Sequence, residues 1–426
     1  MKSVEEDQIT YSDNHGLARA WKSHFVENSV LVCLLAHIIL SRIQFGPITV
    51  RVILGVLTPV IALIALTRPR TDHAGIGLDP SAWANVAYLL FGLGIGLIRE
   101  GNILTSDRTI GRYAVALILI LIVSRADRQW LVVRLVTLLK WVGLVSALVI
   151  LGQSFGFQPA WQLWRVLNPS WSQTAAIRGL DTQSLLPPGI SSAFLSGYYL
   201  AATWAVLLWE QSKSMHEKVR RALSLMLLTV ATYNLQQRSV LVVCGIVFVL
   251  YSLRFLLRAR SVLTLGLLAV ATIGAIFSSS LFVELTKSTR FYEFRDSARI
   301  GATEYALRVF KSSPIVGNRE SYDALGTYGS TILAPHNQIL IALAYYGLVG
   351  LVPMLWIYGS VARRLLRSTL KPMTNREDTE VLTIAVAALL INGLFHNSGP
   401  ATGDLVIAIS LVALSQKPLA ARLLNS

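Results

Sequence analysis

Long apolar segments recur along almost the whole chain, and this feature constrains the fold more than any other. A membrane-spanning helix needs about 20 mainly apolar residues, and such segments follow one another from residue 26 nearly to the end. Of the 426 residues, 54% are hydrophobic and only 14% are charged, whereas soluble domains carry about 25% charged residues. The sequence therefore predicts an all-α, polytopic integral membrane protein.

About twelve segments have the length and composition of membrane helices. Because they recur without a long polar interruption, one helical bundle over residues 26–416 is a simpler interpretation than several domains. It is expected to lie between a cytoplasmic N-terminal tail at 1–25 and a cytoplasmic C-terminal tail at 417–426. The expected helices are 26–44, 47–66, 82–99, 108–124, 133–153, 189–209, 222–237, 239–257, 261–282, 336–360, 380–396 and 402–416.

The positions of lysine and arginine predict the orientation of the bundle. The net charge is +15, but most basic residues flank apolar segments instead of forming one patch, so membrane anchoring is favoured over nucleic-acid binding. The basic clusters fall on alternate connections and beside both termini, which the positive-inside rule assigns to the cytoplasm. The first 25 residues are polar and do not have the pattern of a cleavable signal peptide. We therefore expect a multi-pass protein of a cytoplasmic membrane.

Two long connections, 154–188 and 283–335, fall on the extracytoplasmic side in this arrangement. Long loops in a compact bundle are usually functional or disordered. Trp161, Trp164 and Trp171 favour an ordered first loop at the membrane interface. The second loop contains an amphipathic segment that is expected to form a short helix ending at Pro314.

Lys140 interrupts an apolar segment on the way to this first loop. Together with Arg134, it indicates a membrane helix that begins late, preceded by a stretch lying along the cytoplasmic interface. No catalytic role is expected for it.

Arg238 lies between two apolar segments on the side where positive charge is disfavoured. An arginine in that place needs a partner, and the preceding Asn234, Gln236 and Gln237 extend the polar character into the helix. A cavity wall that binds an anion is one interpretation. The alternative is an arginine that snorkels to the lipid headgroups.

The extracytoplasmic loop adds further arginines, and a guanidinium group presents a planar fork that matches phosphate oxygens. Since acids in the loop nearly balance the bases, surface pairing is the competing explanation. Arg51 and Arg112, just inside their helices at the same face, are further candidates for which snorkelling is the simpler interpretation. The candidate anion-binding residues of the loop are Arg290, Arg295, Arg299 and Arg319.

His336 and Asn337 stand at the entrance of a very apolar helix, directly after Pro335. The dipole and unpaired N–H groups at a helix start favour an anion and a neutral imidazole, which is what a general base requires. A capping or packing role is the alternative. Nine residues separate this pair from Gly347, and Gly350 follows three residues later. Such a glycine pair predicts the close approach of a second helix.

Three pieces of the chain together resemble the O-antigen ligase and polymerase superfamily of bacterial membrane glycosyltransferases. They are "QRSVL" at 237–241, "ARIGATEYALRVFKSSPIVGN" at 298–318 and "HNQILIALAYYGLVG" at 336–350. The order of about twelve helices with a large loop late in the chain also fits. A serine commonly precedes the arginine of the first piece in that family, whereas this chain has Gln237.

The resemblance implies transfer of a glycan from undecaprenyl diphosphate to a saccharide acceptor at the periplasmic face of the inner membrane. By matching position, Arg238 and Arg299 correspond to the family's diphosphate-binding arginines and His336 to its candidate base. Arg290, Arg295, Arg319 and Asn337 are expected to contribute to substrate binding. Since an Asp-x-Asp pair is missing from the segments assigned to the outer face, we expect catalysis without a metal or a cofactor. If the acceptor hydroxyl displaces the diphosphate directly, the transfer inverts the anomeric centre.

The acceptor separates the alternatives within this class. A ligase uses a lipid A-core sugar, and a polymerase uses another carrier-linked repeat unit; the histidine spacing favours the ligase weakly. A secondary transporter or lipid-linked sugar flippase is the alternative from a different class, although transporters concentrate polar groups near the membrane midplane.

Overall fold

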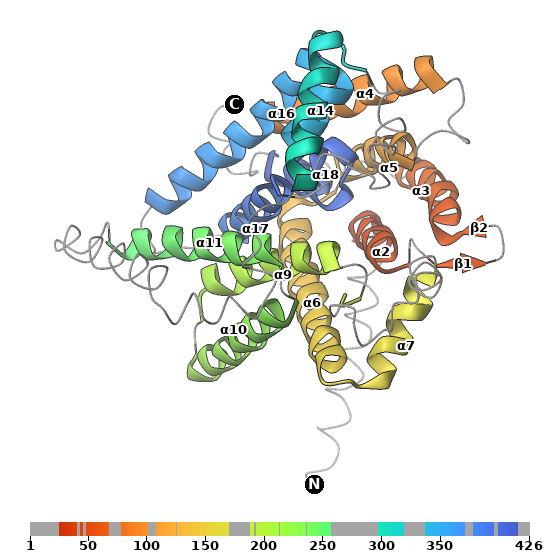
Figure 1. Ribbon diagram of the computed structural model, residues 1–426. Coiled ribbons are helices and arrows are strands. Elements are labelled where there is room, and N and C mark those ends of the chain that lie inside the picture. The colour runs from red at the N-terminus through yellow and green to blue at the C-terminus, as the bar shows by residue number, and fades with distance from the viewer. Residues whose placement is uncertain are drawn as a thin grey trace, which may run out of the picture.

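The computed structural model describes a helical protein (Figure 1). It describes residues 25–40, 43–45, 48–67, 78–100, 108–124, 126–169, 188–190, 193–212, 214–235, 237–256, 297–318, 337–370, 378–395 and 399–415. The helices are α2 (Phe25–Ile39), α3 (Val50–Thr67), α4 (Pro80–Glu100), α5 (Arg108–Val123), α6 (Arg128–Ser154), α7 (Gln158–Leu167), α9 (Ala193–Trp209), α10 (Met215–Leu235), α11 (Arg238–Leu256), α14 (Ser297–Ser312), α16 (Gln338–Leu370), α17 (Asp378–Gly393) and α18 (Leu405–Ser415). A short 3-10 helix, η2 (Pro400–Thr402), precedes α18.

Each expected helix that falls on described residues is present, and the expected helix 261–282 lies outside them. The observed helix boundaries differ from the expected ones where charged residues were expected to end a helix. α6 begins at Arg128, five residues before the expected 133, because Asp127 caps it by accepting from the N–H groups of Gln129 and Trp130 at 2.9 and 3.3 Å. α10 likewise includes the basic residues from Met215 onward.

Two features of the connections were not expected from the sequence. α2 ends at Ile39 rather than at 44, and a pair of two-residue antiparallel strands follows, β1 (Gln44–Phe45) and β2 (Ile48–Thr49). The long connection after α6 contains the helix α7.

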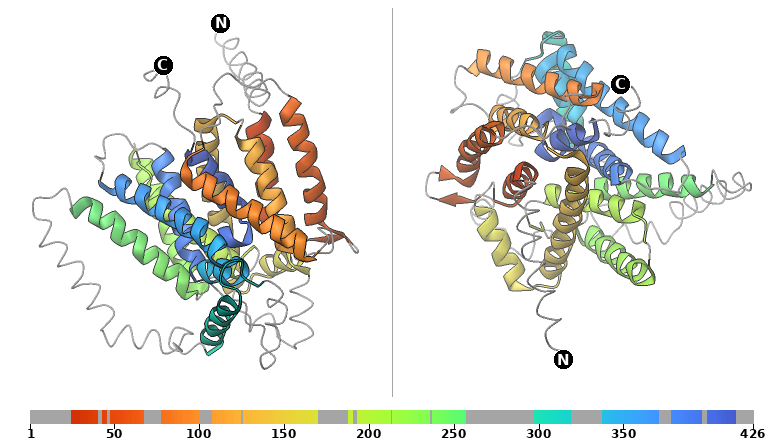
Figure 2. Two further views of the ribbon diagram at one scale, coloured as in Figure 1. Left: turned by 90° about the horizontal axis from the view of Figure 1, so that it is seen from above. Right: turned by 180° about the vertical axis from the view of Figure 1, so that it is seen from behind.

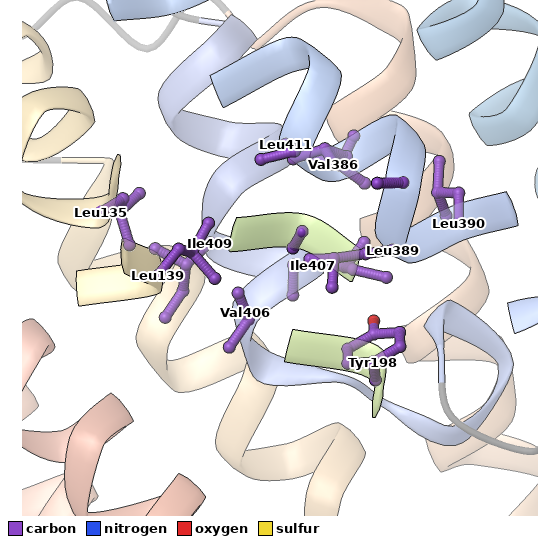
Figure 3. Close-up of a cluster of buried hydrophobic side chains, with 14 of the residues drawn as sticks. Leu135, Leu139, Tyr198, Val386, Leu389, Leu390, Val406, Ile407, Ile409 and Leu411 are labelled. Carbon is purple, nitrogen blue, oxygen red and sulfur yellow. The ribbon is translucent and has the colours of Figure 1, made fainter. Parts of the chain in front are cut away.

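The core lies where α9, α17 and α18 pack together inside the other helices. α17 and α18 are apolar and buried over nearly their whole lengths, as expected for helices enclosed by others rather than for helices with one apolar face. Figure 3 shows this packing, with Leu135 and Leu139 of α6 and Tyr198 of α9 meeting side chains of α17 and α18. These residues belong to one continuous cluster that joins most of the helices.

A close helix contact fixes α6 against α9. The Thr203 hydroxyl donates to the carbonyl of Leu139 at 2.6 Å, and a Cβ on Gly143 would collide with the Thr203 side chain. A small residue opposite a hydroxyl is a common arrangement between helices in an apolar environment, because it lets the two backbones approach.

Charged side chains gather at one end of the bundle, called here the Asp79 end. Arg364 of α16 pairs with Asp79 at the start of α4 and donates to the carbonyl of Leu414 at 2.7 Å. Arg128 donates to the carbonyl of Ala413 at 3.1 Å. The two arginines thereby satisfy carbonyl groups at the end of α18 that have no partner within that helix.

Three of the described helices are long and apolar enough to cross a membrane, at Pro80–Ile98, Arg128–Ser154 and Gln338–Ser368. Several shorter described helices are also apolar. Large apolar side chains on the long helices are exposed, among them Leu90, Leu148 and Val352. The chain is therefore a helical membrane protein, with lipid as the natural partner of these exposed apolar surfaces.

Replacing Arg364 is predicted to destabilise the Asp79 end. Arg364→Ala leaves Asp79 without its cation and the Leu414 carbonyl without its donor, at a cost of about 1–3 kcal/mol. The midpoint of thermal unfolding of the purified protein in detergent should fall. The control is Arg367→Ala, which removes an exposed arginine one turn along the same helix; an equal fall in both variants would contradict the prediction.

Candidate functional site

Helix α16 is broken within the histidine-containing sequence piece. Gly347 has φ 56° and ψ −147°, a conformation outside the helical region. The break leaves backbone groups without their helical partners, and an apolar surrounding makes unpaired backbone groups costly. Gly347 and Gly350 were expected to let a second helix approach closely, and this expectation is wrong. Gly347 forms the break in the helix, and Gly350 packs against Tyr346 of its own helix.

The turn that follows α14 satisfies the broken backbone. The N–H groups of Leu348 and Val349 donate to the carbonyls of Pro314 and Ile315 at 2.9 and 3.2 Å, and the N–H of Asn318 donates to the carbonyl of Ala344 at 3.0 Å. Three backbone hydrogen bonds therefore join the second and third sequence pieces directly.

Two glycines make this contact possible. A Cβ on Gly347 would lie 2.5 Å from the carbonyl oxygens of Pro314 and Ile315, and a Cβ on Gly317 would collide with the backbone of Tyr345. Both glycines have positive φ, at 56° and 68°, which other residues adopt only with strain.

Asn337 caps the start of α16. Its Oδ1 accepts from the N–H groups of Ile339 and Leu340 at 2.9 and 3.2 Å, the usual geometry of an N-cap asparagine. These two N–H groups are therefore used by the protein itself, and the idea that the helix start offers them to an anion does not hold.

Gln338 joins the start of α16 to the turn at 399–404. Its side chain is completely buried, and its Oε1 accepts from the N–H of Ala401 at 2.8 Å. Gly399 is pressed against it, since a Cβ there would lie 2.8 Å from Cγ and Cδ of Gln338. The residue two positions after His336 is thereby held in one place.

Tyrosines hold the other side of the same turn. Tyr113 donates to the carbonyl of Ala401 at 2.6 Å, and Tyr88 donates to it at 3.3 Å. Tyr346 in turn donates to the Tyr113 hydroxyl at 3.2 Å. The turn is thus fixed by α4, α5 and α16 together.

Asp404 ends the turn and begins α18. Its Oδ1 accepts from the N–H of Ile407 at 3.0 Å, and its carboxylate interacts with Arg112 and Tyr198. Sequence interpretation missed Gln338 and Asp404. A usable signal was present for Asp404, because an acid after the turn residues of "SGPATG" and before an apolar run is typical of an N-cap.

The junction of α10 and α11 meets the start of α9 next to Tyr198. Gln237, which precedes Arg238, is buried. A Cβ on Gly197 would collide with the Gln237 side chain and lie 2.6 Å from Cγ2 of Val240. The glutamine that departs from the family pattern thus occupies space that the missing side chain of Gly197 leaves open.

The described backbone locates some of the candidate residues. Arg238 is the first residue of α11, and Arg299 lies in the first turn of α14. His336, Arg290, Arg295 and Arg319 lie outside the described residues. Through the contacts above, the residues next to Arg238 and His336 are both linked to the turn at 399–404, called here the polar cap.

A side chain at Gly347 is predicted to detach the turn of α14 from α16. Gly347→Ala should lower the unfolding midpoint and speed hydrogen exchange at the amides of Leu348 and Val349, because their acceptors are pushed away. Gly359→Ala is the control on the same helix, since a Cβ there meets nothing within 4 Å and alanine favours helix by up to about 1 kcal/mol. Unchanged exchange in Gly347→Ala would disprove the role of the break.

Comparison with known proteins brings no further information on the family. The chain matches no protein-family model, and no curated protein sequence matches it.

Proposed function

We propose that the chain is a membrane glycosyltransferase of the O-antigen ligase type. It would move a glycan from undecaprenyl diphosphate to a saccharide acceptor, in the proposed case the sugar of a lipid A-core, at the periplasmic face of the bacterial inner membrane. The proposal includes a bundle of about twelve spans, with both termini in the cytoplasm.

The observation that carries the proposal is the way the three sequence pieces are connected. The second and third pieces share backbone hydrogen bonds at the break of α16. The third piece contacts the polar cap through Gln338. The first piece reaches it indirectly, since Gln237 packs against Gly197 and the next residue, Tyr198, interacts with Asp404. The three sequence pieces, which are far apart in the chain, are thereby joined through the break of α16 and the polar cap.

Charge supports the proposed orientation. Arg128 and Arg364 lie at the Asp79 end and donate to the last carbonyls of α18, whereas Gln338 contacts Ala401 just before the start of that helix, so the two groups lie at opposite ends of α18. The positive-inside rule assigns the Asp79 end to the cytoplasm. The polar cap then belongs to the periplasmic side, where lipid-linked glycans are transferred.

The proposed chemistry is a direct displacement. The acceptor hydroxyl oxygen attacks the anomeric carbon, its proton passes to the imidazole of His336, and the bond from that carbon to the diphosphate breaks. Arg238 and Arg299 stabilise the negative charge that develops on the leaving diphosphate, an effect that is larger in a water-poor site. Attack from the opposite face inverts the anomeric centre.

Removal of the base or of the first arginine is predicted to abolish transfer. His336→Ala and Arg238→Ala should each lower the rate by about 100-fold or more, measured with purified protein, carrier-linked glycan and acceptor. Arg134→Ala is the control, because Arg134 stacks on Trp130 at 4.8 Å in the first half of α6, near the Asp79 end. A folded variant of either proposed residue with wild-type turnover would remove that residue from the mechanism.

The geometry of the second arginine is tested separately. Arg299→Lys keeps the charge but loses the bidentate fork, so the rate should fall by about 10-fold or more. Arg308→Lys makes the same exchange at an exposed position of the same helix and should leave the rate unchanged. Full activity of Arg299→Lys would indicate simple charge attraction instead of bidentate binding.

The products distinguish ligase from polymerase. A modified core lipid is the product of a ligase, and a ladder of lengthening glycans on the carrier lipid is the product of a polymerase. Supplying the two acceptors separately therefore assigns the acceptor in one experiment.

A transporter or lipid-linked sugar flippase is the second candidate, and the broken helix is the observation that favours it. Transporters often bind substrate where a spanning helix is interrupted. In this chain, however, Pro314 and Ile315 already occupy the amides of Leu348 and Val349 at the break. Uptake or flipping of lipid-linked glycan in proteoliposomes without glycan transfer would favour this candidate over the glycosyltransferase.

A further inference from the structure

Helix α7 has three distinct faces, although it is only 10 residues long. One face is buried in the protein and contains Ala160, Trp161, Trp164 and Leu167. A second face is apolar but exposed, and a third is polar and exposed. A helix on a protein surface in water needs only a buried face and a polar face, so the exposed apolar face requires a separate explanation.

The buried face fixes α7 rigidly to the end of α6. The indole of Trp161 donates to the carbonyl of Gln153 at 3.2 Å, and its ring meets that of Trp164 edge-on at 6.1 Å. Asn168, directly after the helix, donates to the carbonyl of Ile190 at 3.0 Å. The two tryptophans expected at the membrane interface are therefore buried, and they anchor the helix to the end of α6.

The exposed apolar face continues a surface of α6. Leu163 and Val166 form it on α7, and Phe155 and Phe157 precede them in the turn. Phe155 is 83% exposed and Val166 64%. On α6, exposed side chains at helical spacing lead to the same turn, namely Trp141, Val145 and Leu148. Since α6 is long and apolar enough to span a membrane, this apolar surface leads from a candidate spanning helix through Phe155 and Phe157 to α7.

The length of α6 indicates how deep α7 lies. Lys140 pairs at 2.8 Å with Glu210, the residue directly after the end of α9, and the end of this apolar helix locates one boundary of the hydrocarbon layer. From Lys140 to Ser154, α6 rises by roughly 21 Å, whereas the hydrocarbon layer is about 30 Å thick. The turn and α7 therefore fall within the opposite leaflet and not beyond it.

The polar face of α7 carries residues suited to contact lipid headgroups. Gln158, Gln162 and Arg165 are exposed along it, and the centre of this face lies about a quarter turn around the helix axis from the centre of the face formed by Leu163 and Val166. Figure 2 shows α7 at the periphery of the bundle, past the end of α6. An apolar face beside a face with a cationic residue is the arrangement of helices that lie in a membrane interface.

We propose that α7 and the turn at 155–157 lie in the bilayer interface on the side opposite Lys140 and Glu210. Acyl chains of phospholipids contact Phe155, Phe157, Leu163 and Val166, and lipid phosphate groups contact Arg165. This membrane contact does not depend on glycosyl transfer, and it would hold equally for a transporter.

The test compares two faces of the same helix. Leu163→Cys and Gln162→Cys are made in a chain with Cys33→Ala and Cys244→Ala, labelled with an environment-sensitive fluorophore and reconstituted into phosphatidylcholine–phosphatidylglycerol vesicles. Lipids with a shallow nitroxide should quench the label at 163 at least twofold more than the label at 162. Iodide in water should show the reverse order.

Two outcomes would overturn the proposal. Equal iodide quenching at both positions would mean that α7 projects into water. Protection of position 163 from both quenchers would mean that a second copy of the chain, rather than lipid, covers the apolar face.

The unmodified protein provides a second measurement that needs no variant. A photoactivatable phospholipid should crosslink to peptides that contain Phe155, Leu163 or Val166, as located by mass spectrometry. Crosslinks confined to the spanning helices, with none in 155–166, would contradict the proposal even if the cysteine variants fail to fold.

Discussion

Backbone hydrogen bonding at the broken helix is the interaction on which the arrangement of the candidate site depends. A helix inside an apolar bundle can be interrupted only if other groups replace its lost partners. Here the turn at 314–318 replaces them with its own carbonyls and one amide. Helix α14 is therefore attached to α16 through main-chain bonds, which persist unless a new side chain at Gly347 or Gly317 pushes the two segments apart.

The helices could be predicted from the sequence because their signal is local. An apolar run of sufficient length has few alternatives to a helix in lipid. The boundaries failed at Arg128 and Met215, where charged residues continue a helix into a polar region. Charge opposes burial in lipid but does not by itself oppose helix formation.

The site was harder to predict because its contacts join distant parts of the chain. Gly347 was correctly singled out, but a glycine pair fits either a close helix contact or a break, and only the position of residues 314–317 distinguishes them. Gln338 and the polar cap depend on a contact across 63 residues of chain. The period of buried residues in α7 was visible in the sequence, but its tryptophans were interpreted as interface residues.

The short helix α18 has a consequence for how the protein is made. With 11 residues, it is about 16 Å long, well short of the membrane, and its last carbonyls depend on Arg128 and Arg364 of other helices. Such a segment gains little from entering lipid alone. It is the final part of the chain to be synthesised among those described, so its insertion waits for the surrounding helices, and assembly of the core is completed only after translation of the C-terminal region.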